Sequence, residues 1–360
     1  MRSCSGQGRA ICWSVVLLAA LQAGVATAAA ANAPVHIPFI VGLTTVRAVS
    51  APAGDYESVQ VVDKIDAHAE TSTRSAEAPD DNGKVREITT RRTVSTADQR
   101  NSRVLRRYFH EADPAEFPGT NPTFSTVMLN DLRATGKTAM TELDVQSEFG
   151  MSVIKRTLQG VVTRVGTGPI DMTILVNGKL EALPAWHVTG RLSDAGDSED
   201  YEYFVLDQPD NPLILRWKGA GASSFVTKIE FPVPAQSTGA LEQALQDERH
   251  ALVYGIYFEF ARADIRKVSD RTLNEIAAVL RKHPDWKLSI AGHTDGIGKD
   301  TANLDLSQRR AQAVKTALVS RFGIAPDRLS TSGFGASQPK DRNDTAEGRA
   351  RNRRVELTRQ

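Results

Sequence analysis

Cysteine is scarce in this chain: the sequence has two in 360 residues, Cys4 and Cys12, both near its start. A disulfide framework or a zinc site built from thiolates needs more cysteines than these, so both are excluded for the remainder of the chain. Net charge is also close to absent, at +1. No apolar run of 18 residues follows residue 31, and we therefore expect no membrane-spanning helix beyond the N-terminus. Stability has to come from apolar cores.

Residues 1–30 have the layout of a secretory signal peptide. Arg2 and Arg9 precede an apolar run, and small residues follow it. We expect cleavage after Ala28 or Ala30. An alternative remains open, in which the uncharged stretch 11–31 is retained as a membrane anchor. Both interpretations predict export from the cytoplasm.

Residues 35–231 mostly alternate apolar and polar positions, which is typical of β-strands. Turn signals separate the strand-like runs, among them 81–83 (DNG) and Asn177-Gly178, a favoured hairpin pair. The runs YEYFVLD, PLILRWKG and FVTKIEFP predict three consecutive antiparallel strands.

Charges on both faces of the run KVREITTRRTV (residues 84–94) argue against strands embedded in lipid, because each Lys or Arg near the bilayer midplane costs about 2 to 4 kcal/mol. We expect a soluble, mostly antiparallel β-domain over 35–231. No motif within it indicates a function.

Residues 232–250 predict a linker followed by a short helix, since 232–234 (PVP) breaks the strand pattern and 240–250 has helical spacing. From residue 251 to the end, strand and helix patterns alternate. The expected elements are a strand with Tyr254, Ile256, Phe258 and Phe260 on one face, a helix capped by Ser269 with the stripe Leu273, Ile276, Ala277 and Leu280, a strand over 288–290, a helix over 301–322, and strands over 329–332 and 354–358. We therefore predict an α/β domain over 251–360 with the order β-α-β-α-β-β.

The stretch 291–311, AGHTDGIGKDTANLDLSQRRA, concentrates polar side chains where a strand gives way to a helix. Asp295 lies just beyond the strand tip, and Asn303, Ser307 and Arg310 share one helix face at about 100° per residue. A carboxylate and a guanidinium on separate elements can hold opposite ends of a zwitterion such as an amino acid. The simpler alternative is that Asp295 and Arg310 only form an ion pair with each other.

Other chemistries fit this stretch poorly. His293 has no second His or Cys at ligand spacing, so we expect no metal. The residues 296–299 (GIGK) fail the phosphate-loop pattern because Asp300 stands where Ser or Thr is required. Ser307 lacks the sharp strand-to-helix turn of a hydrolase nucleophile. We expect neither a catalytic residue nor a cofactor in this chain. The basic run GRARNRRVE (348–356) suggests nucleic-acid binding. An exported protein is not in contact with nucleic acid, so we expect no nucleic-acid partner.

Residues 255–356 resemble the OmpA-like peptidoglycan-binding domain family. The resemblance lies in YFEFARADI, GHTDGIG, the pattern N-x-x-L-S-x-x-R-A-x-x-V that begins at Asn303, GFGASQP, and the final stretch from Asn343 to Glu356. It implies noncovalent binding to the diaminopimelate residue of the peptidoglycan stem peptide. The family roles that it carries over are an acid for the ammonium group at Asp295, a base for the carboxylate at Arg310, pocket residues at Asn303 and Thr294, and further candidates at Asn352 and Arg354.

The resemblance thus implies a non-enzymatic envelope protein of a Gram-negative bacterium, located in the periplasm with the outer membrane and cell wall. Its β-domain would then contact outer-membrane or periplasmic proteins. Two rivals remain: a wall hydrolase, and a stator-like protein anchored by an uncut first helix. A stator requires an ionisable residue inside its span, and the stretch 11–31 has none.

Overall fold

The computed structural model describes residues 35–79, 85–107, 111, 113–148, 151–232, 239–258 and 262–360. The expected signal peptide 1–30 lies outside the described residues, as do the turn at 81–83, the linker residues 233–238 and Phe260. In the part of the chain that is described, no helix is both long enough and apolar enough to cross a bilayer.

Twelve strands form the larger sheet. They are β1 (Thr44–Ala51), β2 (Gly54–Ile65), β3 (Ala69–Pro79), β4 (Val85–Ser95), β5 (Val104–Leu105), β6 (Lys137–Glu148), β7 (Met151–Arg164), β8 (Ile170–Val176), β9 (Lys179–Ser193), β10 (Ser198–Leu206), β11 (Ile214–Gly219) and β12 (Ala222–Glu230). Their order is β4-β3-β2-β1-β12-β11-β10-β9-β7-β6-β5, and β8 pairs with β12 and β9. Only the β5–β6 and β8–β12 pairs among them are parallel, so the mostly antiparallel prediction is confirmed.

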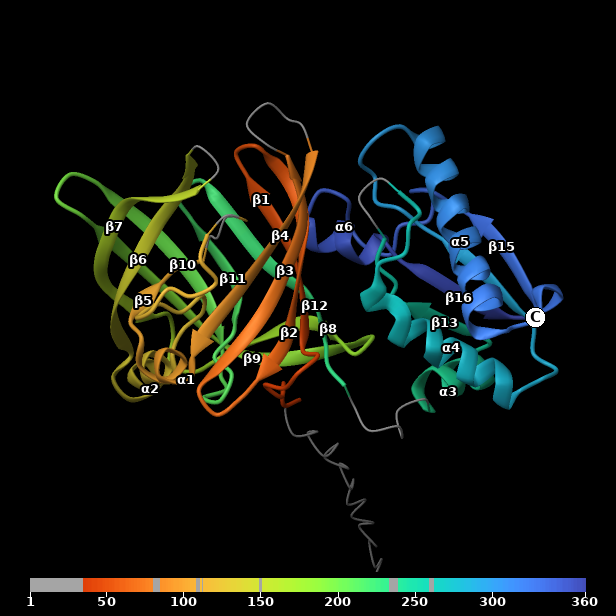
Figure 1. Ribbon diagram of the computed structural model, residues 1–360, viewed down its shortest axis with the longest axis horizontal. Coiled ribbons are helices and arrows are strands. Elements are labelled where there is room, and N and C mark those ends of the chain that lie inside the picture. The colour runs from red at the N-terminus through yellow and green to blue at the C-terminus, as the bar shows by residue number, and fades with distance from the viewer. Residues whose placement is uncertain are drawn as a thin grey trace, which may run out of the picture. The chain divides into compact units, whose positions relative to one another are not determined.

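The larger sheet is strongly curved, and helices α1 (Thr96–Asn101) and α2 (Thr126–Thr135) lie at one end of it (Figure 1). The predicted strands β10, β11 and β12 pair antiparallel in succession. The hairpin between β8 and β9 turns at Asn177 (φ 47°) and Gly178 (φ 81°), the positive values that this pair of residues tolerates.

Helix α2 closes the core of one half of this sheet. Ser125 caps it by accepting a hydrogen bond from the Met128 backbone N–H (3.3 Å). Met128 and Leu132 are fully buried and belong to the same apolar cluster as Tyr203 and Val162. Burying an apolar side chain of this size contributes about 1.5 to 3 kcal/mol, so the cluster fixes α2 on the sheet.

A smaller sheet follows, with the order β13-β16-β14-β15. Its elements are α3 (Gly239–Asp247), β13 (His250–Val253), α4 (Asp270–Lys282), β14 (Leu288–Gly292), α5 (Asp300–Phe322), β15 (Leu329–Gly333), α6 (Ala346–Asn352) and β16 (Val355–Arg359), with 3-10 turns at 267–269 and 326–328. Strands β14 and β15 are parallel, and β16 is antiparallel to both β13 and β14. Both sheets belong to one compact unit, so the boundary at 232–250 stays a prediction.

The predicted order β-α-β-α-β-β is wrong at one point, because α6 lies between β15 and β16. This helix has seven residues and an Arg-rich sequence with no apolar stripe, so periodicity could not reveal it. Thr345 caps it by accepting a hydrogen bond from the Gly348 N–H (3.0 Å).

The first strand of this part is also displaced from the prediction. It covers 250–253 and pairs with β16, whereas Tyr254 and Ile256 continue beyond it without joining the sheet. Ser269 does precede α4, but its hydroxyl does not cap the helix. Instead, it accepts a hydrogen bond from the Tyr257 N–H (2.8 Å) and so ties the segment after β13 to the start of α4.

The predictions of helices α4 and α5 from their sequence patterns are confirmed. The four stripe residues of α4 are all 0% exposed, and α5 ends at Gly323 in the left-handed conformation (φ 70°). Helix α5 lies directly on β14, because a Cβ added to Gly292 would come within 2.2 Å of the Ser307 carbonyl oxygen. This close approach holds the tip of β14 beside the first two turns of α5.

Candidate ligand-binding site

The loop between β14 and α5 is held from within. Asn303, on the first turn of α5, donates from Nδ2 to the backbone oxygens of Asp295 (3.3 Å) and Ile297 (3.0 Å). The Gly296 N–H donates to Oδ1 of Asn343 (2.9 Å), in the segment before α6. The side-chain amide of the predicted pocket residue Asn303 is therefore hydrogen-bonded to the loop backbone. These bonds fix the loop conformation that positions the Asp295 side chain.

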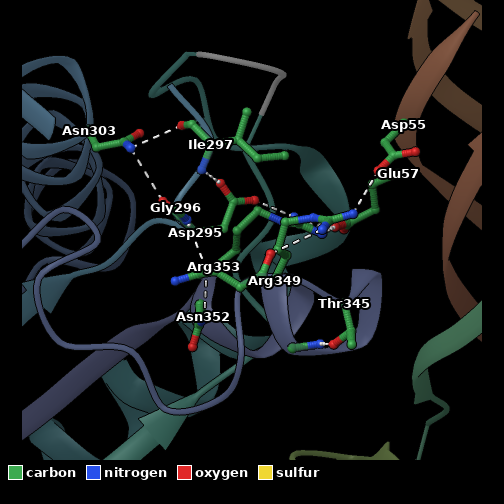
Figure 2. A network of polar contacts seen from close by, with 12 residues as sticks. Asp55, Glu57, Asp295, Gly296, Ile297, Asn303, Thr345, Arg349, Asn352 and Arg353 are labelled. Carbon is green, nitrogen blue, oxygen red and sulfur yellow. Dashed lines mark hydrogen bonds and ion pairs between the residues drawn. The ribbon is translucent and has the colours of Figure 1, made fainter. Parts of the chain in front are cut away.

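Asp295 forms its ion pair with Arg353 (Figure 2). Oδ2 lies 2.6 Å from Nη1 of Arg353, and Oδ1 accepts from the Ile297 N–H at 3.1 Å. The Asp295 side chain is 13% exposed. The simple alternative from the sequence, an ion pair between Asp295 and Arg310, is therefore not what the structure contains.

Arg353 joins two carboxylates from distant parts of the chain. Besides Asp295, it binds Oε2 of Glu57 on β2, at 3.1 Å from Nε and 2.5 Å from Nη2. Burial lowers the pKa of Arg353, but the carboxylates of Glu57 and Asp295 outweigh this effect and raise it above its ordinary value. A parallel contact links Arg349 to Asp55, with Nη2 and Oδ2 2.6 Å apart.

Arg310 lines a cavity of about 90 Å³, together with Arg353 and Glu57. Its Nε donates to the backbone oxygen of Arg262 (3.0 Å), and its guanidinium carbon lies 4.9 Å from the centre of the Phe258 ring. Among the described residues, no carboxylate forms an ion pair with it. Burial and then repulsion from Arg353 lower the pKa of Arg310 to about 10. An anion that enters this cavity would relieve that repulsion.

His293 and Thr294 are buried behind the loop, 2% and 4% exposed. The His293 ring stacks on Phe334 with centroids 5.3 Å apart, and its two nitrogens have no hydrogen-bond partner among the residues that are described. Burial and then repulsion from Arg354 lower the pKa of this imidazole, so it is neutral near pH 7. Thr294 donates its backbone N–H to the Gly335 oxygen (3.0 Å), and its hydroxyl has no partner among the described residues.

Asn352 and Arg354 hold the segment that precedes α6. Oδ1 of Asn352 accepts from the N–H groups of Lys340 (2.8 Å) and Asp341 (3.0 Å), and its Nδ2 donates to the Asp341 oxygen (2.8 Å) and to Asn343. Arg354 donates from Nε to Oε1 of Glu356 (2.8 Å). Arg354 also lines the cavity, but most of its N–H donors are already hydrogen-bonded to other residues of the chain.

Of the predicted site residues, Arg310 and Arg354 line the cavity directly, and Asp295 reaches it through its bond to Arg353. Sequence reasoning missed Arg353 and Glu57 as members of the site. Arg353 could have been found, because it stands inside the final matching motif. Glu57 had no sequence signal, since only folding brings β2 to this place.

Residues 257–353 match the OmpA family. Outer membrane porin F of Pseudomonas aeruginosa is 39% identical over 101 residues, 28% of this chain and 29% of that protein. The peptidoglycan-binding protein ArfA of Mycobacterium bovis is 45% identical over 85 residues, 24% of this chain and 26% of that protein. The match thus spans less than a third of either relative. The crystal structure of the peptidoglycan-associated lipoprotein from Burkholderia pseudomallei is 31% identical and covers 29% of this chain and 88% of that one, with a TM-score of 0.28.

Proposed function

We propose, on the premise that residues 257–353 form an OmpA-family domain, that this chain is a non-catalytic envelope protein that binds peptidoglycan noncovalently. The peptidoglycan binding named for a relative supports this proposal. In this role the protein acts in the periplasm and links the outer membrane or a periplasmic assembly to the cell wall. Its larger sheet then contacts protein partners there.

The proposed ligand is the diaminopimelate residue of the stem peptide, which carries an ammonium and a carboxylate group on one carbon. Arg310 takes the carboxylate through paired N–H donors, and Asp295 takes the ammonium. The observation that carries this assignment is a cavity-lining guanidinium, Arg310, that lies beside a second arginine and has no carboxylate partner among the described residues.

The other predicted site residues support the pocket from behind. Asn303 and Thr294 shape the loop that presents Asp295, and Asn352 and Arg354 hold the facing segment. In this proposal, their substitution weakens wall binding by loosening the loops and not by removing a direct ligand contact.

Co-sedimentation of the purified full chain with isolated cell-wall sacculi tests the proposal. Losing one partner of a desolvated charge pair costs about 2 to 5 kcal/mol, so Asp295→Ala and Arg310→Ala should each weaken binding by at least about 30-fold. Arg309→Ala is the matched control, since the Arg309 side chain is 52% exposed and pairs with Asp305 on the same helix.

Wild-type binding by both site variants would exclude this pocket. Sacculi incubated with the protein should also release no soluble muropeptides, and their release would mark the protein as a wall hydrolase instead.

A further inference from the structure

One face of strands β1 to β4 is buried yet polar. Cross-strand pairing places Arg47 opposite Ser58, Arg74 opposite Thr90, and Arg92 opposite Ser72. The registers of β2 with β3 put all of these residues on the same side of the sheet. Ser58, Ser72 and Thr90 are 1%, 2% and 4% exposed. The neighbouring Arg91, on the opposite side of β4, is exposed.

Such a face is unusual, because the buried side of a sheet is ordinarily apolar. Here buried apolar residues such as Val62, Ala76 and Val94 share that side with many hydrogen-bonding groups. Besides the arginines, these groups are the buried Ser58, Glu70, Ser72, Thr90 and Ser224 and the half-buried Tyr56 and Gln60. The hydroxyl of Ser224 is buried and has no hydrogen-bond partner in the described structure. A face of this kind is better suited to enclosing a polar ligand than to packing a core.

Positive charge exceeds negative charge on this face. Arg107, from the segment after β5, joins the three arginines and binds Glu142, with Nε and Oε1 2.8 Å apart. Arg92 interacts with Glu70. Among the residues that the structure describes, Arg74 has only neutral acceptors, namely the Ser58 hydroxyl (3.1 Å) and the Tyr56 hydroxyl (3.4 Å).

Arg47 is half-buried and has no acceptor among the described residues. Burial, followed by repulsion from the other three arginines, lowers the pKa of Arg47 to about 9. Burial raises the pKa of Glu70 and of Glu142. The guanidinium groups of Arg47 and Arg74 therefore have no counter-charge within the described part of the chain.

We propose that this polar face binds a phosphate-bearing ligand, with Arg47 and Arg74 as the groups that hold the phosphate. A phosphate monoester carries close to two negative charges, which matches the two uncompensated guanidiniums. Their forked donors fit its oxygens in pairs, and the hydroxyls of Ser58 and Ser224 lie on the same face. This site is independent of the wall-binding cavity, and its existence does not depend on the proposed function.

Titration calorimetry on the purified full chain at low ionic strength tests the site with three probes: inorganic phosphate, glycerol 3-phosphate, and dihexanoyl phosphatidic acid below its micellar concentration. At least one probe should bind, and the tightest of the three identifies a free phosphate or a lipid headgroup as the source. Arg47→Gln and Arg74→Gln should each weaken that binding at least about tenfold. Arg91→Gln, on the exposed side of the same sheet, should leave it unchanged.

Thermal unfolding separates a ligand site from a structural role. Removing the Arg47 charge relieves repulsion, so ligand-free Arg47→Gln should melt at a higher temperature than the wild type. The probe that binds should stabilise the wild type and Arg91→Gln equally, and Arg47→Gln less. The proposal is overturned if none of the probes binds, if the Arg47 and Arg74 variants bind like the wild type, or if Arg91→Gln loses as much affinity as they do.

Discussion

The contact between Arg353 and Glu57 allows a quantitative test of the tertiary structure. Their side chains are 28% and 27% exposed, and Oε2 of Glu57 lies 2.5 Å from Nη2. Two charges about 4 Å apart attract by about 4 kcal/mol at an effective dielectric constant of 20, and partial exposure reduces that value. A double-mutant cycle with Arg353→Gln and Glu57→Gln, measured by urea unfolding at pH 7, should therefore give a coupling energy of about 1.5 to 3 kcal/mol.

The pH dependence of this coupling has a definite sign. Burial alone would raise the pKa of Glu57, but the attraction of Arg353 outweighs it and the pKa is lowered. The coupling is then complete above the ordinary glutamate pKa, and it is lost as the pH falls through the lowered value.

An exposed cross-strand pair, Arg191 and Asp200, serves as the control for this cycle, with side chains 66% and 71% exposed. Its coupling should be weaker and should decline with added salt, because solvent screens exposed charges. A coupling below about 0.5 kcal/mol for Arg353 and Glu57 would show that β2 does not contact the C-terminal end of α6 in solution.

Two further predictions concern the loop that carries Asp295. Burial and repulsion from Arg354 lower the pKa of His293, so the unfolded chain takes up a proton near pH 6.5 while the native ring does not. The stability that follows is complete above that pH and is lost below it, by about 1.4 kcal/mol per pH unit until the native pKa is reached. His293→Phe should flatten this part of the stability curve, and an unchanged slope would contradict the assignment. Gly292→Ala forces a Cβ within 2.2 Å of a backbone oxygen of α5 and should lower the free energy of unfolding by at least about 2 kcal/mol. Gly196→Ala meets nothing within 4 Å and should be nearly neutral, so similar losses in both variants would refute the close-packing argument.

The elements that sequence predicted well are those with a strong local pattern. Helix α4 carries four apolar residues at helical spacing, and α5 ends at a glycine that adopts the left-handed conformation. Periodicity is a property of neighbouring residues, so it can be read without knowing the fold. Helix α6 was missed because its seven residues have no such pattern.

Predictions of site membership were less complete than predictions of secondary structure. The motif predicted that Asp295 follows a strand and that Arg310 lies on the next helix, and the structure places Asp295 after β14 and Arg310 on α5. It did not indicate that Asp295 would bind Arg353, or that Asn303 would use its amide on backbone oxygens. The hydrogen-bond capacity of a side chain is known from its type, but its partner depends on what folding brings near.

The amino-acid sequence by itself determined the family of residues 257–353, the strand-rich character of the first half, and the helices with apolar stripes. Only the tertiary structure decided that Glu57 of β2 contacts Arg353, and that Arg47 and Arg74 lie on the same side of the larger sheet. The reason is physical. Apolar spacing and turn residues act through the nearest turns of the chain, whereas charges interact through space, and their distances are set by how the two sheets fold and pack.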